Sequence, residues 1–381
     1  MAAFSPFSPV DIRILPRDQG TAALESLLQG VDGVAVLASA SMIKRLELGP
    51  LIERLLASHG GILLREIPAN PTVSDVCHTL RALDGRKINA LVAIGGGSCI
   101  DLAKAVSALH NLLSGEELSE EAVREAIRQR AYTAPHSFIN IIALPTTAGT
   151  GSEVTKWATV WDPKHHQKLS IDCLENYPKA AICIPEWTAL MSPELTLSTG
   201  LDALSHAMEA FWANSRTPLS QALAISAIEK IRLYLPRVML PEGAGDLEAR
   251  REMCLGALLA GLAFSITRTT ACHSISYPLT MLFGIPHGFA AAMTLCAVLA
   301  RNEDKVPRIR EIRALFAGEG GLPAWLFRLT EPVKPLRLSS FGMRAQDLNA
   351  IVELTFTTGR MDNNPTLFSK QEVFNILKEC L

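Results

Sequence analysis

The sequence predicts two domains of different classes: an α/β domain with a doubly wound, Rossmann-like parallel sheet over residues 1–190, and an all-helical domain over residues 191–381. The chain has 381 residues, 48% of them hydrophobic, which is enough for two buried cores. In the first half, short β-branched runs alternate with amphipathic helical patterns, as in strands that cross over into a parallel sheet. From about Pro193 onward, long segments rich in alanine and leucine replace that rhythm.

Four short apolar runs separated by helical patterns predict four strands in the first domain. The strands span residues 34–38, 62–67, 90–94 and 138–144, and the helices between them span residues 42–58, 73–83 and 100–109. Two further strands, 158–161 and 168–172, flank the polar DPKHHQ turn and predict a hairpin.

The second domain is expected to be a helical bundle. Ser198 and Thr199 precede the helical run LDALSHAMEAFWA, and Pro218 lies near the start of the next run. Gly243 and Gly245 break the chain before a third. These signals place the domain boundary near residue 190.

Charge and composition exclude several classes of partner. Lys plus Arg is 36 against 38 for Asp plus Glu, so no overall positive field exists to bind nucleic acid. Mean hydropathy is +0.21, but the longest apolar stretches, 255–266 and 289–300, fall short of the ~20 residues of a membrane span. The start lacks a secretion signal, and the eight scattered cysteines fit reduced thiols. We expect a cytoplasmic protein without a membrane partner.

A glycine-rich turn lies in NALVAIGGGSCIDLAKAV, between an apolar strand and a helix. Gly95, Gly96 and Gly97 let backbone N–H groups approach a phosphate, and the start of the following helix favours an anion. This pattern indicates a pyrophosphate cradle after the third expected strand. It is not the usual GxGxxG motif, and a tight turn without a ligand is the alternative.

A second polar loop, LPTTAGTGSEVT, follows the strand at 138–144. Its Thr146, Thr147 and Ser152 offer hydroxyl and backbone donors, or serve only as turn and helix-cap residues. Two such loops at the carboxyl ends of neighbouring parallel strands favour a ligand site.

Four metal-ligating side chains occur in the apolar helical half. Asp202 and His206 are four residues apart and project from one helix face, and His273 and His287 follow later in the chain. Any one of them alone would more often be a structural histidine or acid, but polar side chains in apolar helices cost free energy unless they have partners. Imidazole and carboxylate ligands suit Fe²⁺ or Zn²⁺.

The ordered set GGGS, PTTAGTGSEVT, DALSHAMEA and two later histidines 14 residues apart resembles the iron-containing, group III alcohol dehydrogenases over residues 10–300. The resemblance implies a dehydroquinate synthase-like architecture in which metal and nicotinamide meet in the cleft between the domains. It implies that the ion acts as a Lewis acid on a carbonyl while NADPH or NADH supplies hydride. It assigns metal binding to Asp202, His206, His273 and His287, and cofactor binding to Gly96, Gly97, Ser98, Thr146, Thr147, Asn70 and Lys168.

Tyr277 is the first departure from the family pattern. Many relatives have a histidine at this position that relays a proton. The phenol of Tyr277 could donate one, although its ordinary pKa of ~10 requires tuning or a water, or it is only an aromatic wall of the pocket.

Ser39 is the second departure. Many NAD-preferring relatives have an Asp near this position, and its absence here permits the 2′-phosphate of NADPH. Lys44 and Arg45 follow shortly after, and they either support that choice or form an ordinary solvated helix face.

Arg268, five residues before His273, is the third departure. Its guanidinium offers a bidentate partner for an anionic aldehyde, or it pairs with a neighbouring acid. The string RTTACHSISYPLT resembles the phosphonoacetaldehyde reductase branch of the family, which makes 2-hydroxyethylphosphonate in phosphonate biosynthesis.

We therefore expect a homodimeric reductase of a small anionic aldehyde. The alternatives are a dehydrogenase of neutral short-chain alcohols, a cyclase of the dehydroquinate synthase type, and a nucleotide-binding protein without catalysis. Net consumption of NAD(P)H separates a dehydrogenase from the last two.

Overall fold

The computed structural model describes residues 8–165, 167–356 and 359–381, and the chain forms two compact units. The first unit holds the described residues up to Thr147 together with Ser152–Leu190, and the second holds Ala148–Gly151 and Met191–Leu381.

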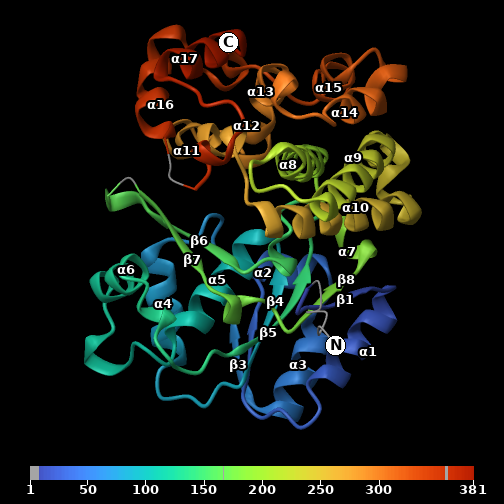
Figure 1. The fold of residues 1–381 in the computed structure, drawn as a ribbon. Coiled ribbons are helices and arrows are strands. Elements are labelled where there is room, and N and C mark those ends of the chain that lie inside the picture. The colour runs from blue at the N-terminus through green and yellow to red at the C-terminus, as the bar shows by residue number, and fades with distance from the viewer. Residues whose placement is uncertain (1–7, 166, 357–358) are drawn as a thin grey trace, which may run out of the picture. The chain divides into compact units, whose positions relative to one another are not determined.

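A six-stranded parallel sheet forms the centre of the first unit (Figure 1). Its spatial order is β1-β8-β5-β4-β2-β3, so β3 and β4 lie on opposite sides of β2. The loops after β2 and β4 therefore flank the point where the strand order reverses, which is where open α/β sheets bind ligands. The strands are β1 (Asp11–Ile14), β2 (Val34–Leu37), β3 (Gly61–Leu64), β4 (Ala90–Gly95), β5 (Asn140–Pro145) and β8 (Ala180–Cys183).

Alternation along the strands divides the apolar residues of this unit into two cores. Leu91 and Ala93 of β4 belong to one core, and Val92 and Ile94 belong to the other. The first core is completed by α4 (Val73–Leu83), α5 (Gly97–Leu109) and α6 (Glu120–Arg128), and the second by α1 (Arg17–Leu27), α2 (Ala40–Arg45), α3 (Gly49–His59) and α7 (Pro185–Thr188).

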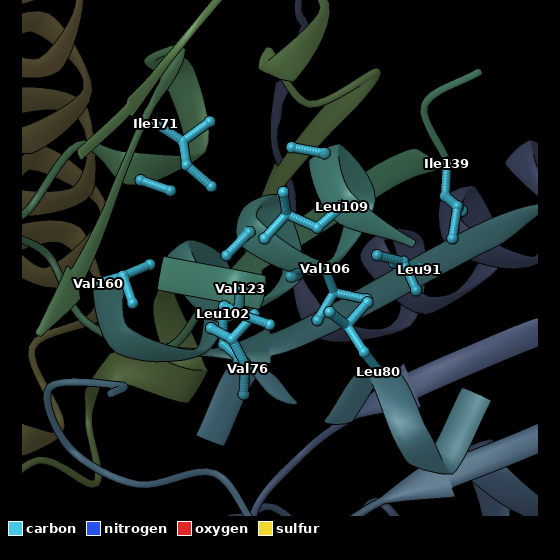
Figure 2. Packing of buried hydrophobic residues seen from close by; sticks show 14 of the residues in the cluster. Val76, Leu80, Leu91, Leu102, Val106, Leu109, Val123, Ile139, Val160 and Ile171 are labelled. Carbon is cyan, nitrogen blue, oxygen red and sulfur yellow. The ribbon is translucent and has the colours of Figure 1, made fainter. Parts of the chain in front are cut away.

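An antiparallel ribbon of β6 (Trp157–Asp162) and β7 (Gln167–Asp172) adds to the first core. Val160 and Ile171 of this ribbon are fully buried and belong to the same cluster as Leu102 and Val106 of α5 (Figure 2). The ribbon thereby covers the helix that follows the glycine loop.

The described part of the second unit is helical. Its helices are α8 (Pro193–Trp212), α9 (Pro218–Met239), α10 (Leu247–Thr267), α11 (Ala271–Phe283), α12 (His287–Met293), α13 (Leu295–Asn302), α14 (Arg310–Phe316), α15 (Leu322–Thr330), α16 (Leu348–Thr355) and α17 (Lys370–Glu379). Helix α8 is buried at every position from Thr196 to Trp212, because α9, α10 and α12 all pack on it.

Within the described residues no single helix is long and apolar enough to cross a membrane. Helices α10 and α11 together reach that length and composition, but the pair is bent by 107° at the break between them.

The doubly wound parallel sheet and the helical second half confirm the expected fold class, but several details of the prediction are wrong. Helix α8 begins at Pro193, so Ser198 and Thr199 lie inside it rather than before it. Residues 42–58 form two helices, because the chain turns at Glu47, whose φ is +53°. The prediction lacks strands β1 and β8. Because β1 precedes the other strands, the glycine loop follows the fourth strand along the chain rather than the third.

Candidate cofactor and metal sites

The two polar loops of the first unit lie side by side. Gly96 is the N-cap of α5 and contributes no side chain, so the first backbone N–H groups of the helix are accessible to an anion. Strands β4 and β5 pair in register up to Gly95 and Pro145, and the Thr146 amide donates to the Gly95 carbonyl at 3.1 Å. The structure thus brings Gly96, Gly97, Thr146 and Thr147 together. Among the described residues, the buried Thr146 Oγ1 has no hydrogen-bond partner.

Asn70 and Ser98 are joined directly, because the Asn70 amide donates to Ser98 Oγ at 3.1 Å. Asn70 has a φ of +55°, a strained conformation that asparagine tolerates better than most residues. Lys168 of β7 lies with its Nζ 5.6 Å from the centre of the Trp161 ring. Ser39 caps α2 by accepting from the Met42 amide at 3.3 Å, directly after β2.

A buried polar network connects α5 to the segment after the second loop. Lys104 Nζ is fully buried and donates to the carbonyls of Ser152 at 2.6 Å and Trp157 at 2.9 Å. Asp101 accepts from Ser152 Oγ at 2.5 Å and from the Thr159 amide at 3.0 Å. Burial lowers the pKa of Lys104 to about 8, against the attraction of Asp101. This network fixes the position of the helix whose N-terminus faces the glycine loop.

In the second unit, Asp202, His206 and His273 each present one ligand atom within 4.8 Å of the other two. His206 Nδ1, His273 Nε2 and His287 Nε2 lie 3.9, 3.4 and 3.8 Å from Asp202 Oδ1. The structure thus brings together residues from three helices that are up to 85 positions apart in the sequence, Asp202 and His287 being the outermost. Helices α8, α11 and α12 supply them.

Three of the converging atoms are buried and lack a hydrogen-bond partner among the described residues: Asp202 Oδ1, His206 Nδ1 and His273 Nε2. Leaving such atoms unsatisfied is costly, so a shared ligand is expected at their common centre. Two imidazole nitrogens and a carboxylate oxygen fit a divalent ion such as Fe²⁺ or Zn²⁺.

The electrostatics of the cluster favour a charged aspartate. Burial alone would raise the pKa of Asp202, but the surrounding histidines hold it well below its ordinary value. Burial lowers the pKa of His206 to about 4, which leaves its ring neutral. A neutral imidazole beside a carboxylate is the form that binds a metal ion.

Glu209, which we did not single out from the sequence, holds His273 in place. Its buried carboxylate accepts from the amides of Thr270 at 3.1 Å and Cys272 at 2.8 Å, at the start of α11. It also bonds His273 Nδ1, so the other ring nitrogen faces Asp202. The sequence contains a pattern that could have identified Glu209, because Asp202, His206 and Glu209 have the i, i+4, i+7 spacing of one helix face.

Gly288 allows α12 to pack closely on α8. A Cβ added at Gly288 would lie 1.7 Å from the Ser198 carbonyl oxygen, so a larger residue would push the two helices apart. The neighbouring residue, His287, begins α12. The close approach therefore sets how near His287 comes to the α8 ligands.

Tyr277 lies beside the cluster, and Arg268 ends the helix α10. The Tyr277 ring is nearly parallel to the His287 ring, with centroids 6.0 Å apart, and it is buried. Burial raises the pKa of Tyr277, although the Arg360 guanidinium and a hydrogen bond with Thr269 oppose the rise. Arg268 caps α10 with a φ of +62° and a ψ of 179°, a conformation otherwise nearly restricted to glycine.

The comparison with known proteins identifies the family. A model described as "Iron-containing alcohol dehydrogenase" matches residues 14–185, and one described as "Fe-containing alcohol dehydrogenase family, C-terminal" matches residues 196–381. The chain belongs to the iron-containing alcohol dehydrogenase family. It is therefore an oxidoreductase that uses a nicotinamide dinucleotide and a divalent metal ion.

Two curated relatives of this dehydrogenase differ in substrate. It is 33% identical to the phosphonoacetaldehyde reductase of Streptomyces viridochromogenes over 334 residues, which cover 84% of this chain and 82% of that protein. It is 30% identical to the NADPH-dependent butanol dehydrogenase of Clostridium saccharobutylicum over 392 residues, covering 96% of this chain and 97% of that one.

Among solved structures, an iron-containing alcohol dehydrogenase from Thermotoga maritima matches this dehydrogenase with a TM-score of 0.83 at 30% identity, covering 98% of both chains. The sulfoacetaldehyde reductase of Bifidobacterium kashiwanohense in complex with NAD⁺ matches with a TM-score of 0.84 at 27% identity, covering 98% of this chain and 97% of that one.

Proposed function

We propose that this dehydrogenase is an NADPH-dependent reductase of a small anionic aldehyde, and that its substrate is phosphonoacetaldehyde, reduced to 2-hydroxyethylphosphonate for phosphonate biosynthesis. The observation that carries the proposal is Arg268, which keeps a strained backbone at the end of α10, where glycine would be relaxed. Strained backbone of this kind clusters at functional sites. A guanidinium pairs well with a phosphonate.

In this proposal the second unit binds the metal ion and the carbonyl end of the substrate. Asp202, His206, His273 and His287 hold Fe²⁺ or Zn²⁺, with Glu209 orienting His273 through Nδ1. A bound divalent ion polarises a carbonyl oxygen, and the reduced nicotinamide supplies hydride. Tyr277 keeps its phenolic proton at neutral pH, because burial raises its pKa, and it can donate that proton toward the product oxygen.

The first unit holds the nucleotide in this proposal. The donors of the glycine loop and of the neighbouring threonine loop bind the pyrophosphate, and Ser39 leaves room for the 2′-phosphate of NADPH. Arg45, whose Nη1 lies 3.5 Å from the Leu190 carbonyl, comes from the last turn of the helix that Ser39 caps. The assigned residues are Ser39, Asn70, Gly96, Gly97, Ser98, Thr146, Thr147 and Lys168. We further propose that the enzyme is a homodimer.

Steady-state kinetics of the metal-loaded enzyme test the substrate. We expect kcat/KM for phosphonoacetaldehyde to exceed that for propanal and butanal at least tenfold, with NADPH preferred over NADH. Equal values for the anionic and neutral aldehydes would refute the anionic substrate, and so would full activity of Arg268→Ala on phosphonoacetaldehyde.

A neutral short-chain aldehyde is the second candidate, supported by the 30% identity to a butanol dehydrogenase over nearly the whole chain. The same panel decides between the two, because this candidate requires that butanal be reduced more efficiently than phosphonoacetaldehyde.

A further inference from the structure

The segment from Gly359 to Asn364 lies against Tyr277. Arg360 places its guanidinium carbon 5.0 Å from the centre of the Tyr277 ring. Tyr277 in turn faces His287 of the metal cluster. Arg360 and a candidate metal ligand therefore both lie close to the same aromatic ring.

Hydrogen bonds hold this segment in place. The Asn363 side-chain amide donates to the carbonyls of Thr267 at 2.7 Å and Thr269 at 3.2 Å, the two residues that flank Arg268. The buried side-chain amides of Asn364 and Asn302 form two hydrogen bonds with each other, at 3.0 and 3.1 Å. Arg360 thus extends from a backbone whose position is fixed relative to α10 and α13.

The same segment touches Arg268. A Cβ added at Gly359 would lie 2.9 Å from Arg268 Nη1, and Gly359 has a φ of +80° that a side chain would strain. The absence of a side chain at Gly359 therefore leaves room for the Arg268 guanidinium beside this segment. Arg268 therefore contacts the residue that directly precedes Arg360.

Arg360 is only partly buried, and among the residues that the structure describes it makes no ion pair. A guanidinium that lies over an aromatic face keeps its N–H groups at its edge, where they can bind an oxyanion in bidentate fashion. A partly desolvated cation that pairs with no acid among the described residues is suited to a charged substrate.

We propose that Arg360 is a specificity-determining residue that binds the oxyanion of the aldehyde substrate, while Tyr277 holds the plane of its guanidinium. This proposal rests on the proposed reduction of an anionic aldehyde and adds a second cation to Arg268. The ligand chemistry is a tetrahedral oxyanion, a phosphonate or a sulfonate, on the carbon next to the carbonyl.

Kinetics of Arg360→Ala and Arg360→Lys in the metal-loaded enzyme test the proposal. The substrates are phosphonoacetaldehyde, sulfoacetaldehyde and propanal, and Arg310→Ala, which removes an exposed arginine on α14, controls for net charge. We expect Arg360→Ala to lower kcat/KM for the preferred anionic aldehyde by about 10- to 100-fold and to change kcat/KM for propanal less than threefold. For the anionic aldehyde, kcat/KM of Arg360→Lys should fall between the values of wild type and Arg360→Ala. Lysine keeps the positive charge but cannot form the bidentate hydrogen bonds of a guanidinium.

A binding measurement provides a readout without turnover. Calorimetric titration with ethylphosphonate and ethanesulfonate, which lack a carbonyl, should show weaker binding to Arg360→Ala than to wild type, and unchanged binding to Arg310→Ala. The anion whose affinity falls more in Arg360→Ala, relative to wild type, is the one that the site prefers.

The outcomes separate this inference from the proposed function. If wild type prefers an anionic aldehyde and Arg360→Ala keeps that preference, only the role of Arg360 is refuted. If Arg360→Ala instead raises KM for NADPH alone, the residue serves the nucleotide and the inference is also refuted. If wild type shows no preference for either anion, the proposed function itself fails.

Discussion

Buried charge around Glu209 shows how single residues prepare the metal site. Its carboxylate accepts from backbone amides at the start of α11 and from His273, so one acid both caps a helix and selects a tautomer. A glutamine of the same shape would place an amide donor against His273 Nδ1. The ring proton would then move to Nε2, the nitrogen that faces Asp202.

We therefore expect Glu209→Gln to weaken metal binding by roughly 10- to 100-fold. Titration of the metal-free protein with Zn²⁺ measures this, and circular dichroism checks that the fold is kept. Glu311→Gln, which changes an exposed acid paired with Arg308, is the matched control and should bind like wild type. Equal affinity in both variants would contradict the role of Glu209.

Arg268 gives a second prediction at the scale of one residue. Arg268→Gly and Arg268→Ala both remove the guanidinium, but only glycine relaxes at a φ of +62°. The free energy of unfolding of the glycine variant should exceed that of the alanine variant by about 1–3 kcal/mol. Urea denaturation measures the difference, and an alanine variant as stable as the glycine variant would show that the backbone there is not strained.

The metal-ligand residues could be predicted from the sequence, whereas Arg360 could not. The spacing of Asp202 and His206 on one helix face, with two more histidines in apolar surroundings, is a local pattern that can be read directly. Arg360 could not be found this way, because its contact with Tyr277 joins residues 83 positions apart through hydrogen bonds made by Asn363 and Asn364.

At the scale of elements, strands with strong apolar runs were predictable, whereas the edge strand β1 and the alanine-rich strand β8 were not. Asp11–Ile14 alternates charged and apolar residues at the sheet edge, and Ala180–Cys183 contains two alanines, which have low strand propensity. Both are held by pairing with neighbours rather than by their own pattern. Helix α5, in contrast, combines a clear start at the glycine loop with apolar periodicity.

The buried network beside α5 predicts a pH dependence. Glu153 is buried, and this raises its pKa from 4.5 to about 7. Between these values the folded state binds more protons than the unfolded state, so the stability contributed at this site falls as pH rises from about 4.5 to 7. Glu153→Gln cannot ionise. We expect the wild type to lose stability relative to Glu153→Gln over that interval, measured by urea denaturation at pH 5, 6 and 7.5. A constant difference across the three pH values would refute the shift.

At the scale of the whole molecule, the chain has two units with separate interiors. The glycine and threonine loops belong to the first unit, apart from residues 148–151, and all four metal-ligand candidates belong to the second. Each ligand should therefore stabilise mainly the unit that binds it, and unfolding need not be a single transition.

Hydrogen exchange followed by mass spectrometry tests this division. Zn²⁺ should slow exchange in α8 and α11, and NADPH should slow it in the first turn of α5 and the end of β4. Removal of the metal with a chelator should reverse the first effect without changing the second. Equal loss of protection in α5 on chelation would show that the two units respond as one.

The strained turn at residue 268 also has an evolutionary consequence. Arginine codons of the CGN and AGR sets become glycine codons through one base change, and that change would relieve the backbone. A lineage that abandoned a charged substrate would have nothing to retain the arginine and a gain in stability from losing it. The identity of this one residue would therefore record whether selection for an anionic substrate is still acting.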